Sequence, residues 1–374
     1  MAVVQSRRSR VTIALLTFSS RMSAAISLSK SEKSYIQTAL DAPSPIRADG
    51  RSLLDYRSIA LETGVASLAN GSARVNIGKD AGEESGSGTE VIAAVKLEVE
   101  GVLDGDGVDG GRIVCTVSWF VSDSAFSFFL SPFAKGCKAS SPAAYPHLSS
   151  TALDDLSYDM TIILNQCLSH PSLHPKNLGI IPKRKSWLLN LDAIVLSNSG
   201  NVYDALFLAA RSALWDTKVP KTRGVQYQPK SNVLRDQDVE MTADGSDSIF
   251  NTKGVTNAAD FELVDYWDEG EPLEITQEWP VCVTLNLARI PNSIRRRGLT
   301  IRQVSANLPP TYFLDATPQE EAAIPLRLLL LFSFSPSGTR LQSMRLMGDG
   351  ETQLESMTQL LEVSTSDISG HTPL

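Results

Sequence analysis

The stretch VLSNSGNVYDALFLAARSALWDTKVP, from Val195 to Pro220, predicts a strand, a tight turn and a helix. This layout is one that proteins use to hold a phosphate, because a helix N-terminus presents free backbone N–H groups and a partial positive charge. The first turn of the expected helix, however, carries Val202, Tyr203 and Asp204. A phosphate site built on this turn would therefore contain a carboxylate and no Arg, Lys or Thr.

The chain before this stretch alternates between segments typical of strands and of helices. Apolar, β-branched runs bounded by Gly and Asn predict strands, and apolar residues on one helical face predict helices. For the helix over 151–168, Thr151 is expected to be the N-cap. The expected strands are 58–65, 71–78, 89–100, 110–118 and 186–197, and the expected helices are 31–40, 151–168 and 201–215.

The chain after this stretch repeats the same plan in weaker form. Residues 230–256 are polar and of mixed charge, which predicts a surface loop or linker. Strands are expected at 279–287, 310–317 and 325–334, and an amphipathic closing helix at 350–363. Two β-rich halves with helices predict an α+β fold with an internal duplication.

Composition limits the classes of function. The chain has 374 residues and a formal net charge of −8, which argues against autonomous, nonspecific nucleic-acid binding but allows a local basic patch. The four cysteines are widely spaced without a CxxC pair, so neither a zinc cluster nor a disulfide framework is expected. His170 and His174 have a metal-binding spacing, but Pro171 and Pro175 break helical geometry. We expect no metal and no cofactor. No apolar run reaches the roughly 20 residues that a membrane span needs, so we also expect no membrane segment.

Three segments differ from their surroundings. Residues 1–29 are rich in arginine and resemble a targeting peptide; the alternative is an upstream extension, with Met22 as the working start. Residues 119–137 are rich in Phe without a helical or strand period, and residues 288–307 form a basic block with four arginines among residues 295–302. Each of these two segments is either a functional loop or inserted sequence such as a translated intron.

Several strings of the sequence together resemble the RNase PH family and, more narrowly, the ring subunits of the eukaryotic RNA exosome. The resemblance implies an RNase PH-like fold (ribosomal protein S5 domain 2-like) with two pseudo-repeated β-α halves, assembled in a six-membered ring around an RNA channel. The strings are IRADGRSLLDYRSIALETGV (46–65), ANGSARVNIG (69–78), TEVIAAVKLEVEG (89–101), AYPHLSS (144–150), HPKNLGI (174–180), LLNLDAIVLSNSGNVYDALFLAARSALWDTKVP (188–220) and FLDATPQEE (313–321).

The resemblance also implies a division of the chain. Residues 30–228 are expected to form the first RNase PH-like domain and residues 229–278 a linker and surface loop. Residues 279–374 are expected to form the second domain, with the insert 288–307, and residues 1–29 an extension that the mature protein need not contain.

The resemblance implies a degenerate phosphate site in the opening stretch. Active members cleave RNA with inorganic phosphate, which they hold at the turn matched by Gly200, Asn201, Val202, Tyr203 and Asp204. Here Val202 has no hydroxyl, Tyr203 replaces a cationic donor, and Asp204 is expected to interact with the helix N–H groups and to repel phosphate. We therefore expect a turn that holds no phosphate and a chain with no catalytic residue.

Two further departures from active members agree with this expectation. Active members supply arginines around the helix matched by 151–168, whereas no Lys or Arg occurs here between Lys138 and Lys176. They also place an acidic residue just before an apolar strand of the second half, where this chain has EEAAIPLRLLLL (320–331). We expect Glu320 and Glu321 to belong to a helix start or turn rather than to a catalytic pair.

The basic residues that remain are candidates for RNA contact or solvated loops. They are Lys183, Arg184, Lys185, Lys218, Lys221 and Arg223. The expected function is a non-catalytic exosome ring subunit in the nucleus, nucleolus and cytoplasm. Its expected partners are other RNase PH-like subunits, RNA-binding cap subunits and the RNA in the channel. The alternatives are an active phosphate-dependent 3'–5' exoribonuclease and a standalone RNA-binding protein that uses the basic block 288–307.

Overall fold

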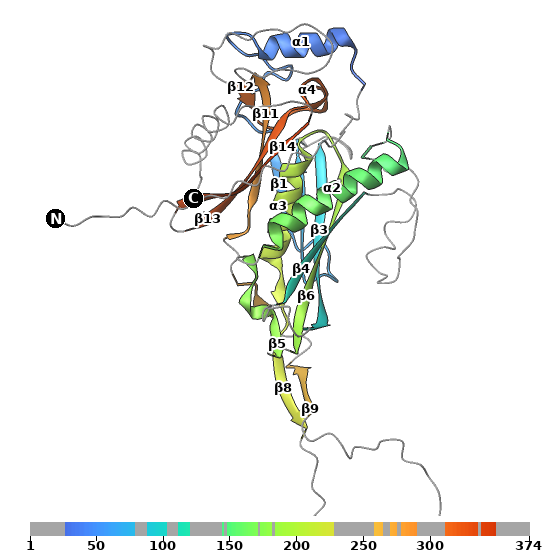
Figure 1. Ribbon diagram of the computed structural model, residues 1–374, viewed down its shortest axis with the longest axis vertical. Helices are drawn as coiled ribbons and strands as arrows, with labels where there is room; N and C mark the ends of the chain where they lie inside the picture. The colour runs from blue at the N-terminus through green and yellow to red at the C-terminus, as the bar shows by residue number, and fades with distance from the viewer. Residues whose placement is uncertain are drawn as a thin grey trace, which may run out of the picture.

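The structure is a computed structural model, and within it we describe residues 27–78, 88–102, 111–119, 144–145, 148–170, 173–181, 184–227, 258–264, 270–274, 278–289, 311–335 and 338–348. These residues form two large β-sheets with helix α3 (Val202–Asp216) between them (Figure 1), and two small two-stranded pairs. Most of the extension 1–29, nearly all of the segments 119–137 and 288–307, and the whole closing helix at 350–363 lie outside the described residues.

The larger sheet belongs to the first half of the chain. Its strand order is β1-β2-β3-β6-β4, and β5 pairs with the beginning of β6. The β4–β6 pair is parallel and the other pairs are antiparallel. The strands are β1 (Ile59–Thr63), β2 (Gly71–Ile77), β3 (Thr89–Gly101), β4 (Arg112–Trp119), β5 (Gly179–Ile181) and β6 (Lys185–Ser197).

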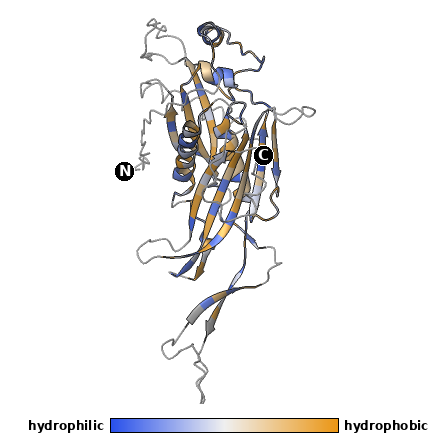
Figure 2. Ribbon diagram, turned by 90° about the vertical axis from the view of Figure 1, so that its right-hand side faces the viewer, coloured by the Kyte–Doolittle hydropathy of each residue, from blue (hydrophilic) through white to orange (hydrophobic). Residues whose placement is uncertain are grey.

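One face of this sheet carries the main core. Along β2, β6 and the first part of β3 (residues 91–95), every second side chain is apolar and buried, because alternate residues of a strand point to the same face. Helices α2 (Ser150–Leu168) and α3 pack on that face, and Cys282, Leu329 and Leu331 of the second sheet join the same buried cluster. Figure 2 shows these apolar residues concentrated in the strands of the body.

Helix α2 begins earlier than the sequence indicates. Its N-cap is Ser149, whose hydroxyl accepts a hydrogen bond from the N–H of Ala152. The prediction that Thr151 is the N-cap is therefore wrong. Ser149, Ser150 and Thr151 are consecutive hydroxyl residues, and each is a suitable N-cap, so their residue type alone does not show which of them precedes the first helical residue. The predicted end of the helix at residue 168 is confirmed.

The second half forms an antiparallel sheet of order β12-β11-β13-β14. Helix α1 (Lys30–Leu40) packs against the short helix α4 (Pro318–Ala323) at the top of Figure 1. The strand predicted over 310–317 ends at Phe313 because Asp315 adopts a left-handed backbone conformation. The strands are β11 (Val281–Arg289), β12 (Thr311–Phe313), β13 (Arg327–Ser335) and β14 (Gly338–Met347).

Strands β8 (Thr222–Tyr227) and β9 (Ala258–Leu263) pair as a two-stranded arm that projects from the body (Figures 1 and 2). A second small pair joins β7 (Lys218–Val219) to β10 (Glu271–Pro272). Both β9 and β10 lie within residues 229–278, so the linker expected there contains strands that return to the first half. No helix in the described part of the chain is long and apolar enough to cross a membrane.

Candidate functional site

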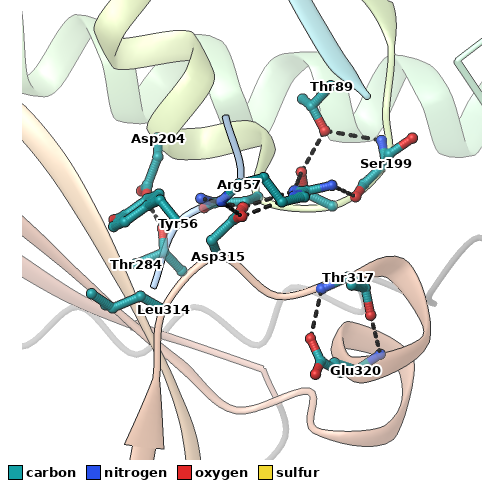
Figure 3. Close-up of polar contacts among 12 residues, drawn as sticks. Tyr56, Arg57, Thr89, Ser199, Asp204, Thr284, Leu314, Asp315, Thr317 and Glu320 are labelled. Atoms are coloured by element: carbon teal, nitrogen blue, oxygen red, sulfur yellow. Dashed lines mark hydrogen bonds and ion pairs between the residues drawn. The ribbon is translucent and has the colours of Figure 1, made fainter. Parts of the chain in front are cut away.

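The turn between β6 and α3 is held tightly against the second half of the chain. Gly200 has a φ of 89°, and a Cβ atom there would lie 2.2 Å from the carbonyl oxygen of Ala316. Asn201, the N-cap of α3, has a φ of 59° and makes no side-chain cap hydrogen bond. The hydroxyl of Thr89 accepts from the N–H of Ser199 at 2.9 Å and donates to the carbonyl of Gly200 at 2.5 Å (Figure 3). The backbone of the turn is therefore fixed from both halves.

A carboxylate from helix α4 already binds at the N-terminus of α3. The backbone N–H of Asn201 donates to Oε1 of Glu321 at 2.8 Å. The same oxygen lies 3.2 Å from Nη1 of Arg327, which begins β13. A helix N-terminus favours an anion through its N–H groups and its dipole. Glu321 supplies that anion from within the chain.

Asp204 does not interact with the helix N–H groups as the sequence predicts. Its side chain is buried; Oδ1 accepts from the hydroxyl of Thr284 at 2.7 Å and Oδ2 from the hydroxyl of Tyr56 at 2.9 Å (Figure 3). Burial raises the pKa of Asp204 to about 6, although these hydrogen bonds act to lower it. The carboxylate therefore joins α3 to β11 and to the segment before β1. Its partners lie far away in sequence, which is why a local capping rule fails here.

The other side chains of the matched turn offer nothing to a phosphate. Val202 and Tyr203 are both buried and belong to the main core cluster. Burial also raises the pKa of the Tyr203 phenol well above its usual value. The positions that the family resemblance assigns to phosphate donors thus carry packing residues.

Asp315 is the centre of a second polar cluster beside the turn. Its carboxylate is fully buried and accepts from Nε and Nη2 of Arg57 at 2.8 and 2.7 Å, and from the backbone N–H of Arg57 at 2.8 Å. Arg51 donates to it at 2.6 Å and the side-chain amide of Asn201 at 3.1 Å. Burial acts to raise the pKa of Asp315, but the hydrogen bonds and charges of Arg57 and Arg51 outweigh it and lower the pKa below its usual value.

Arg57 also binds the turn itself. Its Nη1 donates to the carbonyl of Ser199 at 2.7 Å and its Nη2 to the carbonyl of Gly200 at 3.3 Å. The guanidinium therefore faces backbone oxygens of the turn and the carboxylate of Asp315 (Figure 3). A cation that in principle suits a phosphate is fully engaged with partners inside the chain.

Glu320 has a structural role. It accepts from Nε and Nη2 of the buried Arg47 at 3.0 and 2.8 Å, and it forms a capping box with Thr317 at the start of α4. Arg47 also donates to the carbonyls of Leu314 and Asp315. The prediction of a helix start in DATPQEE is confirmed, and neither Glu320 nor Glu321 is free to act as a general acid.

The candidate RNA-binding residues that the structure describes lie far from the turn. Lys183 is outside the described residues. Lys185 donates to Asp260 at 2.9 Å and lies over the ring of Phe261, at the base of the arm formed by β8 and β9. Since β6 begins at Lys185 and ends at Ser197, roughly 40 Å of strand separates this region from the turn.

The other candidate residues gather around the same end of the molecule. Arg184 is exposed just before β6, and Lys218, Lys221 and Arg223 are exposed on or beside β7 and β8. Arg223 lies opposite Glu262 in the β8–β9 register. Together these residues make a mixed-charge surface at the base of the arm.

The sequence does not indicate the arginines and the aspartate that hold the turn in place. Arg47, Arg51 and Arg57 lie in the string IRADGRSLLDYRS, and Asp315 lies in FLDATPQEE. Both strings belong to the family resemblance, but nothing in the local sequence indicates that residues more than 250 positions apart form ion pairs. Among the described residues no group of three or more His, Cys, Asp or Glu is arranged to hold a metal ion.

Comparisons with known proteins agree with the fold described above. Residues 55–220 match the family described as 3' exoribonuclease family, domain 1, or RNase PH. This part of the chain belongs to the RNase PH family, and the described fold is the RNase PH-like fold. The archaeal exosome core is similar over 90% of this chain and 94% of its own, with a TM-score of 0.50 at 18% identity. The Archaeoglobus fulgidus exosome with RNA bound to the active site has the same coverage and gives a TM-score of 0.51 at 19% identity.

Named relatives narrow the resemblance to the type called ribosomal RNA-processing protein 42. A Dictyostelium discoideum protein named "Putative exosome complex exonuclease RRP42" is 28% identical over 241 residues, 53% of this chain and 66% of the relative. The "Exosome complex component Rrp42" of Methanothermobacter thermautotrophicus is 30% identical over 175 residues, 46% of this chain and 53% of the relative. The chain thus spans between about half and two thirds of the length of these relatives.

Proposed function

We propose that this chain is a ring subunit of the RNA exosome that has no phosphorolytic site of its own. It helps to build the channel through which RNA reaches nucleases supplied elsewhere, in 3'–5' RNA processing and degradation that includes rRNA maturation. The Rrp42 relatives and the likeness of the fold to archaeal exosome cores support the assembly.

The main observation in support of an absence of catalysis is the contact between Glu321 and Asn201. A phosphate at the N-terminus of α3 has to displace the Glu321 carboxylate from the Asn201 N–H. It then lies in a region where Asp204 and Asp315 are buried, and like charges repel strongly where water is scarce. The arginine nearest to the turn, Arg57, is already held by Asp315 and two carbonyls.

The partners follow from the assembly. We propose that other RNase PH-like subunits complete a six-membered ring, that RNA-binding cap subunits cover it, and that RNA passes through the channel. The net charge of −8 fits an assembly of several chains, because the affinity for RNA is then distributed over all of them. The exposed residues Arg184, Lys218, Lys221 and Arg223 remain candidates for RNA contact. We propose the nucleus, the nucleolus and the cytoplasm as locations.

The absence of catalysis is tested with the purified full chain. Single-stranded RNA is incubated with and without inorganic phosphate, and released nucleoside diphosphates are measured. We expect no release above the buffer control. A Glu321→Gln variant distinguishes intrinsic activity from a contaminating nuclease, because a contaminant is unaffected by the substitution. Phosphate-dependent release that changes in the variant would contradict the proposal.

The assembly is tested separately by purifying the tagged chain from its native cells and identifying its partners by mass spectrometry. We expect other RNase PH-like chains in amounts comparable to the tagged chain. Recovery of the chain alone would contradict the ring assignment and leave the fold unaffected.

A further inference from the structure

One edge of the larger sheet is closed by side chains of helix α2. A stripe of four polar residues at a spacing of four faces the edge strand β4: Ser157, Thr161, Asn165 and Ser169. The amide of Asn165 accepts from the N–H of Cys115 at 2.8 Å and donates to its carbonyl at 2.7 Å. Thr161 accepts from the N–H of Val117 at 3.0 Å, and Ser157 donates to its carbonyl at 2.5 Å. These bonds replace the neighbouring strand that an edge lacks.

The opposite edge, strand β1, has no comparable cover among the described residues. The N–H of Gly64 donates to the carbonyl of Ser72, and the N–H of Gly78 donates to the carbonyl of Ser58. Because hydrogen bonding alternates along an antiparallel pair, the even-numbered residues of β1 face β2. The N–H and carbonyl groups of Ile59, Leu61 and Thr63 therefore point away from the sheet.

Strand β1 also has few of the usual features that protect an edge. Its sequence, IALET, contains no Lys and no Pro, and its pairing with β2 has no bulge. Its one charged residue, Glu62, lies opposite Arg74, one position away from the register of Leu61 and Val75. All five of its residues are exposed. A regular, uncovered strand of this kind is a template for pairing with another chain.

The apolar face of the sheet continues onto β1. Ile59 lies opposite Ile77, and Leu61 lies opposite Val75, so all four side chains are on the same face. Ile77 and Val75 are buried in the main core, whereas Ile59 and Leu61 are 47% and 49% exposed. Helix α3 packs mainly on β2 and β3. The row of core side chains therefore continues onto β1, one strand beyond β2 and β3, the strands that helix α3 mainly covers.

A second apolar group lies at the end of β1. The carboxylate of Asp216, the last residue of α3, accepts from the N–H groups of Gly64 and Ser72. Its neighbour Trp215 is 54% exposed. The end of α3, which carries this exposed indole, thus lies beside the end of β1.

We propose that the open edge of β1 pairs with an extended strand of a neighbouring RNase PH-like chain and so continues the sheet into that chain. This inference rests on the proposed function, which supplies such a neighbour. A protein strand fits the surface better than RNA does, because residues 59–63 contain no cation and present apolar side chains. A second copy of this chain is disfavoured because each copy carries a net charge of −8, so the neighbour is a different, less acidic chain.

The test uses two substitutions of Leu61 in the full tagged chain, expressed in its native cells. Leu61→Pro removes an outward N–H without removing a bond to β2, and Leu61→Lys places a charge on the edge. Val114→Lys is the matched control, because Val114 is 43% exposed on the closed edge strand β4. The readouts are the melting temperature of each purified variant and the amount of RNase PH-like chains that co-purify with it.

We expect both Leu61 variants to fold and to recover about tenfold less of one RNase PH-like chain, since each substitution disfavours strand pairing. The Val114→Lys variant recovers the wild-type amount. Leu61 variants that recover the wild-type amount overturn the edge pairing and leave the ring assignment standing. A wild-type chain that recovers no RNase PH-like chain overturns both. Recovery of a second, differently tagged copy through β1 overturns the choice of neighbour.

Hydrogen exchange gives an independent measurement on the same strand. In the free full chain, the outward amides of Ile59, Leu61 and Thr63 should exchange rapidly, while those of Ala60 and Glu62 are protected by β2. In the purified assembly all five amides should be protected. Rapid exchange of the outward amides in the assembly would overturn the proposal.

Discussion

Replacing Asp204 by Asn should make the chain more stable above neutral pH. The Asp204 carboxylate is buried, and burial raises its pKa from 3.8 to about 6. In the native state the proton is therefore held more tightly than in the unfolded state, where the pKa keeps its usual value. The stabilising contribution of the protonated form is fully present below pH 4 and is lost as the pH rises through about 6.

The size of the effect on stability follows from the shift in the pKa of Asp204. A shift of about two pKa units corresponds to about 3 kcal/mol of unfolding free energy. The substituted side-chain amide carries no charge, and the hydroxyls of Tyr56 and Thr284 can rotate so that one donates to its oxygen and the other accepts from its NH₂ group. The stability difference between the Asp204→Asn variant and the wild type should thus move in favour of the variant by about 3 kcal/mol between pH 4 and pH 7.

Urea unfolding of the full chain, followed by tryptophan fluorescence from pH 4 to 7.5, measures this difference. The matched control is Asp55→Asn, because Asp55 is exposed and its pKa is lowered by its hydrogen bonds to Ser52. The stability difference between the Asp55→Asn variant and the wild type should therefore change only below pH 4, and it should be constant across the measured range. If the stability difference between the Asp204→Asn variant and the wild type is also constant with pH, the reasoning is refuted.

Two further substitutions test the packing around the site. Asp315→Ala should cost about 3–5 kcal/mol, because it leaves the guanidinium groups of Arg57 and Arg51 partly buried without a carboxylate; a loss below about 1 kcal/mol in urea unfolding contradicts the importance of this cluster. Asn165→Ala should cost about 1–3 kcal/mol and speed the exchange of the Cys115 amide, because both backbone groups of Cys115 lose their partner. An unchanged exchange rate at Cys115 would show that Asn165 does not close the edge.

The regular elements near the turn could be predicted because their signals are local. The apolar run before the turn and the helical pattern after it place β6 and α3 within one residue of their observed ends. The pairs β7–β10 and β8–β9 could not be predicted in the same way. Each joins segments separated by tens of residues, and polar two-stranded pairs have no strong periodic pattern.

The residues of the site were harder to predict than the fold. The sequence indicates Asp204 as a residue that excludes phosphate, but its expected contact with the helix N–H groups is wrong. Its partners come from positions 148 residues earlier and 80 residues later in the chain, beyond the reach of a capping rule. The anion at the helix N-terminus is Glu321 instead, which the sequence indicates only as part of a short helix.

We propose that this turn excludes phosphate for two separate reasons, so removing one should not restore binding. Replacing Glu321 with a neutral residue frees the Asn201 N–H from its internal carboxylate. Val202 and Tyr203 remain buried in the core and supply no donor, and Arg57 remains bound to Asp315 and the turn carbonyls. One freed N–H is a weak anchor for a dianion beside the buried Asp204 and Asp315 carboxylates. In the function proposed above, the chain then contributes to RNA processing through its surfaces, and the edge of β1 is the surface for which we propose a specific contact.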